Sequence, residues 1–183
     1  MNIQLHKVAG ENPFIYHPEL ATIWPEPLNA FAWEATEETL ALNGADGSEI
    51  FLIAVDGAVA GITGYMPYFE ASEPGTPVTR MSVSKVCLRW HGVLPRYRGQ
   101  GISKLVIRQM TEFGQAAFPN ATQFIELVPN NTLGVATAAY FSGLGFVATG
   151  HAEFIEEFGM EFLEYAIPID LLRQARVYVP GKV

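Results

Sequence analysis

Hydrophobic and polar residues follow two different periods along the chain, and these predict alternating helical and extended segments. Apolar residues recur every three or four positions over residues 28–42 and 102–118, which predicts two helices. A third helix, rich in small residues, is predicted over residues 132–144 and ends at Gly145. Extended segments, most of them rich in β-branched and aromatic residues, are predicted at residues 2–8, 49–55, 58–69, 78–93, 123–128, 146–154 and 159–167.

The order of these segments predicts the class of fold. Asp56-Gly57 separates two extended segments and is typical of a tight hairpin turn, so those strands are expected to be antiparallel. The helix over residues 102–118 lies between two extended segments and is expected to cross over between parallel strands. Together these features predict a mixed α/β sheet with helices on both faces. Residues 9–27 contain four prolines and residues 70–77 two, so both are expected to be loops.

Composition narrows the class of protein. With 183 residues, 49% of them hydrophobic and 16% charged, the chain is expected to form one domain over residues 1–183 with a core of its own. There is no run of 18 apolar residues and no basic start followed by an apolar stretch, so neither a membrane span nor a secretory signal is expected. A lone cysteine, Cys87, forms no internal disulfide and no zinc site by itself, and fits a cytoplasmic protein without a metal.

Charge is distributed unevenly along the chain. The net charge of −8 argues against general nucleic-acid binding. Seven basic residues and no acid occupy residues 80–108, whereas residues 109–170 hold eight acids and no lysine or arginine. This basic window indicates either a local site for an anionic ligand or an ordinary solvated charged surface, and charge alone does not decide between them.

A glycine-rich basic turn within that window is the sharpest motif. A strand is expected to end at Pro95, and a helix to begin at about Gly101. The first N–H groups of a helix have no partner inside the helix, and glycines let a ligand approach the backbone, so a diphosphate fits such a turn. The alternative is an ordinary strand-to-helix turn. Neither common nucleotide motif matches, because the dinucleotide fingerprint would need glycine at Lys104 and the P-loop sequence is absent.

The hexapeptide Arg96-Tyr97-Arg98-Gly99-Gln100-Gly101 resembles the acyl-CoA motif [QR]-x-x-G-x-[GA] of the GNAT superfamily of N-acetyltransferases. The longer pattern V-x-P-x-Y-R-G-x-G-I also matches, from Val93 to Ile102. The resemblance covers roughly residues 49–167. It implies a central, mostly antiparallel mixed sheet flanked by helices, in which the fourth and fifth strands splay apart near Gly92 and Val128.

The same resemblance implies that the pantetheine arm of acetyl-CoA enters this splay. A backbone N–H near Gly92 would then polarise the acetyl carbonyl. A primary amine of a small molecule or protein would attack the thioester directly. The residues implied to contact coenzyme A are Gly92, Val93, Leu94, Arg96, Arg98, Gly99, Gln100, Gly101, Ile102, Ser103 and Asn131.

Direct attack requires a group that protonates the leaving thiolate and a group that takes the amine proton. Members of the family often use a tyrosine on the helix after the fifth strand as the acid. Counting from that strand places Tyr140 at this position, whereas counting back from Gly145 places Phe141 there. We favour Tyr140 because phenylalanine has no proton to donate. The candidate bases are His91, Glu126 and Glu70, and a chain of water molecules is the alternative.

The acceptor is the least determined part of the prediction. The acid-rich segments indicate either a site for a cationic amine or solvated surface. A different acyl donor, or a non-catalytic acyl-CoA sensor or subunit, would produce the same cofactor motif. The expected partners are acyl-CoA and an unidentified amine acceptor, with no nucleic acid and no membrane, and a homodimer is a further possibility.

Overall fold

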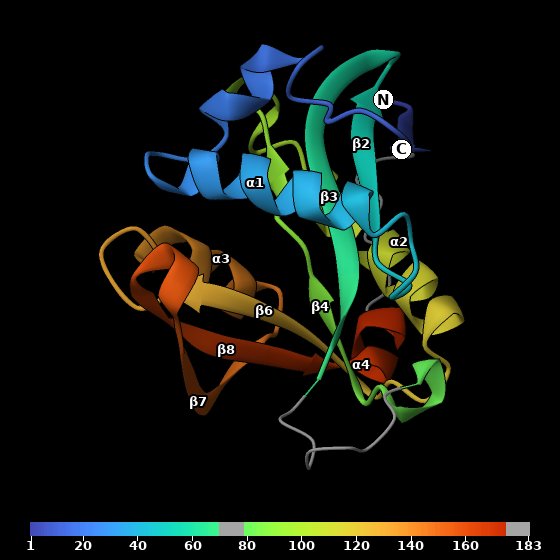
Figure 1. Ribbon diagram of the computed structural model, residues 1–183, viewed down its shortest axis with the longest axis vertical. Coiled ribbons are helices and arrows are strands. Elements are labelled where there is room, and N and C mark those ends of the chain that lie inside the picture. Colours follow the sequence, from blue (N-terminus) through green and yellow to red (C-terminus); the bar gives the residue numbers. More distant parts are fainter. Residues whose placement is uncertain (70–78, 175–183) are drawn as a thin grey trace, which may run out of the picture.

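The described residues form eight strands in one sheet, with four helices around it (Figure 1). The structure is a computed structural model that describes residues 1–69 and 79–174. The strands are β1 (Ile3–Lys7), β2 (Glu49–Val55), β3 (Ala58–Tyr68), β4 (Lys85–Leu88), β5 (Gly92–Val93), β6 (Gln123–Pro129), β7 (Val147–Ile155) and β8 (Met160–Pro168). The helices are α1 (Leu28–Ala41), α2 (Ile102–Ala117), α3 (Val135–Gly143) and α4 (Ile169–Gln174), with single 3₁₀ turns at Pro18–Thr22, Arg80–Ser82, Pro95–Tyr97 and Glu156–Phe158.

The sheet confirms the predicted mixed, mostly antiparallel class. Its order is β1-β2-β3-β4-β6-β8-β7, with β5 paired to β3. Among the described strands, β4 and β6 make the one parallel pair, and α2 is the crossover between them. Their ladder has only three pairs and ends at Cys87 opposite Ile125. Beyond that point the two strands are no longer paired, so the sheet splays there as expected. The Asp56-Gly57 hairpin turn is also confirmed, with φ of 50° and 84° at the two residues.

The prediction of one long strand over residues 78–93 is wrong. The segment contains a 3₁₀ turn and two short strands, and β4 stops at Leu88 before β5 begins at Gly92. Trp90 interrupts it with a φ of +44°, a conformation that bulky residues rarely adopt. The interruption removes the strand from the ladder with β6 and lets β5 pair with β3 alone. Residues 70–77, including Glu70, lie outside the described residues.

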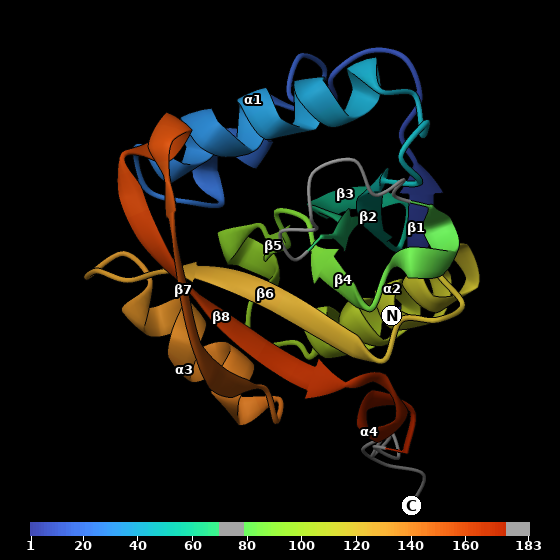
Figure 2. The ribbon, with the colours of Figure 1, turned by 60° about the horizontal axis from the view of Figure 1, so that its bottom comes forward.

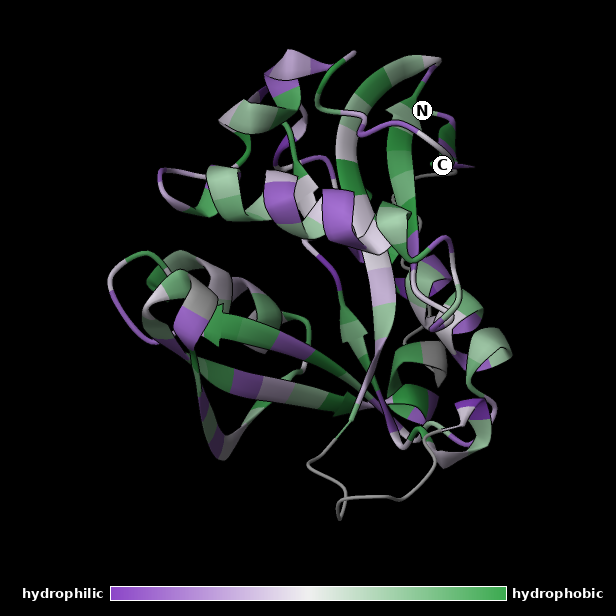
Figure 3. Cartoon of the chain, viewed as in Figure 1, coloured by the Kyte–Doolittle hydropathy of each residue, from purple (hydrophilic) through white to green (hydrophobic). Residues whose placement is uncertain are grey.

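The described residues form three hydrophobic clusters, and two of them pack helices against the sheet. The larger cluster joins α2, through residues such as Val106 and Met110, to Val86, Phe124 and Ile167 of the strands. The second cluster includes Ala32 of α1, together with Ile50, Ile62 and Leu94. Figure 2 shows α1 apart from α2 and α3, with the strands between them. In Figure 3, β2 is hydrophobic along most of its length, whereas α1 mixes hydrophobic and hydrophilic residues, as suits a helix with one buried face.

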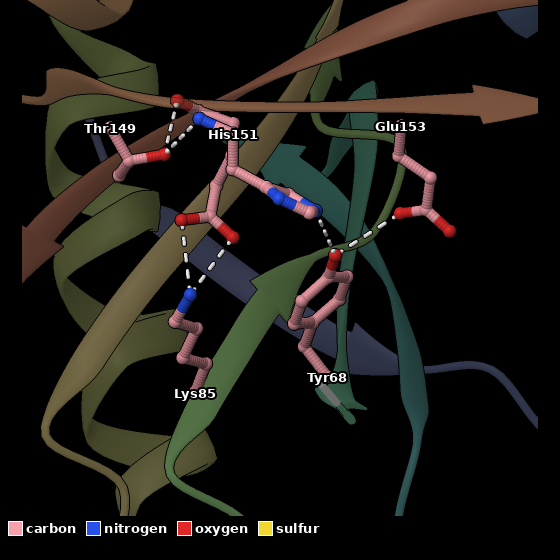
Figure 4. Close-up of polar contacts among 6 residues, drawn as sticks. Tyr68, Lys85, Thr149, His151 and Glu153 are labelled. Carbon is pink, nitrogen blue, oxygen red and sulfur yellow. Dashed lines mark hydrogen bonds and ion pairs between the residues drawn. The ribbon is translucent and has the colours of Figure 1, made fainter. Parts of the chain in front are cut away.

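A polar network ties β4 to the two last strands (Figure 4). Lys85 Nζ lies 3.1 Å from both carboxylate oxygens of Glu164, whose side chain is only 1% exposed. Nearby, the Tyr68 hydroxyl donates to Glu153 at 3.1 Å and lies 3.4 Å from His151 Nε2. Removing one member of a buried ion pair leaves the other charge unpaired, so this contact helps to hold β4 and β8 on the two sides of β6.

Among the described residues, none of the helices has both the length and the apolar character needed to cross a membrane. The prediction of one domain with a cofactor-binding core over about residues 49–167 stays a prediction, although every described strand belongs to the same sheet.

Candidate active site

A cavity of about 700 Å³ opens where β4 and β6 separate. Its walls come from residues 23–28 before and at the start of α1, from the region between β4 and β6, from the beginning of α2, and from α3. Ile155, Phe158 and Phe162 complete the lining. The same cavity is lined by the glycine turn and by all three predicted catalytic residues, His91, Glu126 and Tyr140. Segments far apart in the sequence therefore meet at the predicted splay.

The glycine turn presents free backbone donors to this cavity. Gly99 and Gly101 have φ of 75° and 76°, and a Cβ added at either one would meet no atom within 4 Å. The backbone N–H groups of residues 99–103 donate no hydrogen bond to any other described residue. At the start of a 16-residue helix these groups carry partial positive charge, so the turn fits a diphosphate approaching from the open side.

Arg98 braces the turn against its neighbours. Its Nε donates to the Val93 carbonyl at 3.2 Å and its Nη2 to the Ile23 carbonyl at 2.7 Å. The guanidinium thus joins the turn both to β5 and to the segment before α1. Arg98 lines the cavity, and two of its N–H donors form hydrogen bonds with backbone carbonyl groups.

Gly92 is required by close packing. An added Cβ would overlap Ile23 Cγ2 and lie 2.6 Å from Trp24 Cζ2. The φ of Gly92 is not in the left-handed region, so crowding alone constrains this position. The absence of a side chain lets residues 23 and 24 cover β5 directly.

Substituting Gly92 with alanine is expected to lower the free energy of unfolding by about 1–3 kcal/mol, because the new methyl group overpacks this contact. The matched control is Gly143→Ala in α3, where an added Cβ meets nothing within 4 Å. There alanine should be neutral or stabilising by up to about 1 kcal/mol, since it favours helix more than glycine does. Urea denaturation of both variants measures the difference, and equal effects would contradict the crowding at Gly92.

Four residues predicted to contact coenzyme A do not line the cavity. Leu94 is 1% exposed, its N–H donates to the Ala60 carbonyl at 2.8 Å, and its own carbonyl accepts from Tyr97. Its N–H is therefore already paired with β3, and the expected pairing of this residue with pantetheine stays a prediction. Arg96 lies over the Tyr97 ring and donates to Val59, Gln100 donates from its side chain to Arg96, and Asn131 caps its own loop at Leu133.

His91 is held in one orientation by a neighbouring strand. Its Nδ1 lies 3.1 Å from Thr63 Oγ1, while Nε2 is buried and has no hydrogen-bond partner among the described residues. Burial lowers the pKa of His91 to about 4 because the charged imidazolium loses its hydration. The ring is therefore neutral at physiological pH, and it is a weak proton acceptor.

The lowered pKa of His91 predicts a loss of stability in acid. In the unfolded chain a histidine gains its proton near pH 6.5, whereas folded His91 gains it only near pH 4. Stability from the neutral ring is therefore fully present above pH 6.5 and falls as the pH drops toward 4. Between pH 7.5 and 5 the free energy of unfolding should fall by about 2 kcal/mol more in the wild type than in His91→Gln. Denaturant titrations at both pH values test this, with exposed His6→Gln as the control that keeps the wild-type dependence.

Glu126 shows the opposite shift. It lies on β6, and its Oε2 is buried without a hydrogen-bond partner among the described residues. Burial raises the pKa of Glu126 well above the ordinary value for a carboxyl group. A carboxyl group whose pKa is moved toward neutrality is a stronger base once it ionises, so Glu126 is suited to take a proton inside the cavity.

Tyr140 and Phe141 have different environments. Phe141 is 3% exposed and packs in the large cluster, with its ring 5.1 Å from that of Phe146. Tyr140 is 38% exposed and lines the cavity. Burial raises the pKa of Tyr140, and a hydrogen bond with the Ser103 side chain acts in the opposite direction. The phenol therefore keeps its proton at neutral pH, and it stands beside the first turn of α2.

The comparison with protein families decides what this arrangement is. The family model of the GNAT acetyltransferases matches residues 17–146, which is more than half of the chain. The chain belongs to the GNAT acetyltransferase family. It is therefore an acyl-CoA N-acetyltransferase, and acetyl-CoA is the donor used by this family.

Solved structures with low sequence identity share the fold of this GNAT acetyltransferase. A GNAT-family acetyltransferase from Desulfovibrio desulfuricans has 15% identity and a TM-score of 0.66, covering 92% of this chain and 99% of its own. A chimaeric spermidine N-acetyltransferase from Vibrio cholerae has 13% identity and a TM-score of 0.60, covering 94% and 99%. A GNAT acetyltransferase from Elizabethkingia anophelis, solved with acetyl-CoA bound, has 12% identity and a TM-score of 0.61, covering 91% and 98%. No curated protein is significantly similar.

The charges of this GNAT acetyltransferase do not gather as the linear sequence suggested. Of the seven basic residues of the window, Arg89, Arg98 and Lys104 line the cavity. The others point elsewhere: Lys85 binds Glu164, and Arg108 lies 3.7 Å from Glu112 on the same helix. Among the described residues, Glu126 is the one acid lining the cavity. Nor do the described residues hold a cluster of three or more His, Cys, Asp or Glu that could bind a metal.

Several lining residues of the GNAT cavity were missed by the sequence analysis. Trp24, Trp90 and Phe158 face it from three separate loops, and Thr63 supports it through His91. No spacing in the sequence marks these residues as neighbours. The one available signal was aromatic content near the motif, since Trp90 precedes the glycine turn by nine residues.

Proposed function

We propose that this N-acetyltransferase transfers the acetyl group of acetyl-CoA to a primary amine by direct attack on the thioester. The supporting observation is that one cavity joins the free N–H groups of the glycine turn to Glu126 and Tyr140. These free donors and the open space at Gly99 and Gly101 fit the coenzyme diphosphate. The residues that would hold the coenzyme are Gly92, Val93, Arg98, Gly99, Gly101, Ile102 and Ser103, and the backbone N–H of Gln100 fits the same role.

In the proposed mechanism, the thioester supplies an activated carbonyl, and the chain supplies the proton transfers. As the N–C bond forms and the C–S bond breaks, Glu126 accepts the amine proton, while Tyr140 donates its proton to the departing sulfur. The raised pKa of Glu126 makes its carboxylate a stronger base once it has ionised, and the raised pKa of Tyr140 keeps the proton on the phenol at neutral pH. His91 is the weaker base because burial lowers its pKa, so we assign it to positioning through Thr63.

The activity is tested by incubating the protein with acetyl-CoA and a panel of primary amines. Formation of the acetylated amine is followed by mass spectrometry, and release of free thiol is measured in parallel. We expect amine-dependent thiol release matched by acetylated product. Binding of coenzyme A without any acetylated product would contradict the proposed function.

The assignment of the base is tested by two substitutions at the same site. Glu126→Gln should lower kcat/KM by about 10²- to 10⁴-fold, the usual contribution of a general base, whereas His91→Gln should lower it less than about tenfold. The reverse order of effects would transfer the base role to His91. A cytoplasmic location and a homodimer stay predictions.

A further inference from the structure

The half of the cavity nearest α1 has an aromatic wall, which we define as Trp24, Trp90, Phe158 and Phe162. All four residues line the cavity. Their ring centroids form a continuous chain: Trp24 to Trp90 at 5.6 Å, Trp90 to Phe158 at 6.1 Å, and Phe158 to Phe162 at 5.7 Å. The pairs are T-shaped or tilted, which leaves ring faces and edges available to another ring.

Local backbone features hold this wall in place. Trp90 has a positive φ and lies between β4 and β5, where side chains no longer alternate between the two faces of a strand. Arg89 donates to the Ala35 carbonyl of α1, and Trp90 packs on Trp24. His91 contacts Thr63 of β3. From the other side, Phe31 of α1 stacks on Phe158 at 4.5 Å. A bulky residue in a strained conformation persists only where its surroundings fix it, and such strain concentrates at functional sites.

The described lining offers one carboxyl group for an amine to contact. This group is Glu126, the one carboxyl group among the described lining residues. Arg89 is the basic residue nearest α1, where it donates to Ala35 and Met66 and lies 3.7 Å from Glu38.

We propose that the acceptor is a monoamine that carries an aromatic ring, of the 2-phenylethylamine type. Its ring packs against the aromatic wall, and its amino group reaches the carboxyl group of Glu126 and the thioester. This inference rests on the proposed function and narrows its acceptor to one chemical class.

The first test compares four amines with acetyl-CoA as the donor: 2-phenylethylamine, 2-cyclohexylethylamine, propylamine and spermidine. Burial of the ring should raise kcat/KM for 2-phenylethylamine about 10- to 100-fold over propylamine. The cyclohexyl amine separates aromatic contact from bulk, and we expect it to react several-fold more slowly than the phenyl amine. A kcat/KM for spermidine or propylamine equal to that for 2-phenylethylamine would overturn the proposal.

The second test removes one ring of the wall. Phe158→Ala should lower the ratio of kcat/KM for 2-phenylethylamine to kcat/KM for propylamine about tenfold. Phe154→Ala is the matched control, because Phe154 is 62% exposed and does not line the cavity. Phe158→Leu keeps apolar bulk if the alanine variant does not fold, and it should lower the same ratio, because the aromatic ring is lost. An unchanged ratio between the two amines in both Phe158 variants would contradict the role of the wall.

A binding measurement separates this inference from the proposed function. Calorimetric titration of each amine into protein saturated with coenzyme A needs no turnover. Selective binding of 2-phenylethylamine that is lost in Phe158→Ala supports the wall even if no amine is acetylated, in which case only the proposed function fails. Acetylation without ring selectivity removes the inference alone. Faster transfer from phenylacetyl-CoA to propylamine, with no ring preference among amines, would assign the wall to the acyl donor and also overturn it.

Discussion

Replacing Gly99 or Gly101 with aspartate is expected to weaken coenzyme A binding by at least about 100-fold. Each substitution places a carboxylate beside the free N–H groups, where the diphosphate would approach. Two like charges about 4 Å apart repel by about 4 kcal/mol near a protein surface, which exceeds the 2.7 kcal/mol that a 100-fold change requires. Isothermal calorimetry with coenzyme A measures the effect directly.

Two controls separate charge from backbone strain. Gly150→Asp introduces the same side chain at a φ of 84° into open space on β7, away from the cavity, and should leave coenzyme affinity unchanged. Gly99→Ala introduces strain at the turn without charge and should weaken binding far less than Gly99→Asp. Near-wild-type affinity in both aspartate variants of the turn would remove the assignment of the diphosphate site.

Replacing Tyr140 with phenylalanine is expected to lower kcat about 100-fold or more. The ring would remain, and only the hydroxyl that donates to the leaving sulfur would be lost, so the Kd for acetyl-CoA should change little. Because burial raises the pKa of Tyr140, its proton is retained as the pH rises. The wild-type kcat should therefore not fall between pH 7 and 9 through loss of this proton.

The matched control for Tyr140 is Tyr16→Phe, which removes a hydroxyl from a side chain that is 63% exposed and outside the cavity. It should leave both kcat and the Kd unchanged. If single-turnover measurements show the chemical step of Tyr140→Phe at the wild-type rate, another group must protonate the thiolate, and Tyr140 loses its assigned role.

The sequence was informative where function depends on neighbouring residues. The glycine turn needs only a strand end, two residues with positive φ and a helix start, all within residues 93–103. Periodicity likewise located the three long helices and most strands to within a few residues. Counting could not decide whether Tyr140 or Phe141 occupies the acid position of the family pattern. Counting forward from the preceding strand gives Tyr140, and counting back from Gly145 gives Phe141. The structure separates them by burial, which depends on how α3 packs on the sheet.

Features that depend on contacts between distant segments could not be predicted. The strand that stops at Leu88 reads as continuous in the sequence, because no proline interrupts it and Trp90 favours strands. The contact between His91 and Thr63 depends on the pairing of two strands after this interruption. The opposite pKa shifts of His91 and Glu126 follow from burial inside the splay, and the sequence carries no direct measure of burial.

The brace made by Arg98 connects the coenzyme turn to the segment that carries Trp24. One guanidinium holds the carbonyl of Val93, next to the coenzyme turn, and the carbonyl of Ile23, next to Trp24. Any displacement of the turn on coenzyme binding is therefore transmitted to the segment that carries the first ring of the aromatic wall. Thermodynamic linkage makes such coupling reciprocal. If the coenzyme tightens acceptor binding by some factor, the acceptor tightens coenzyme binding by the same factor.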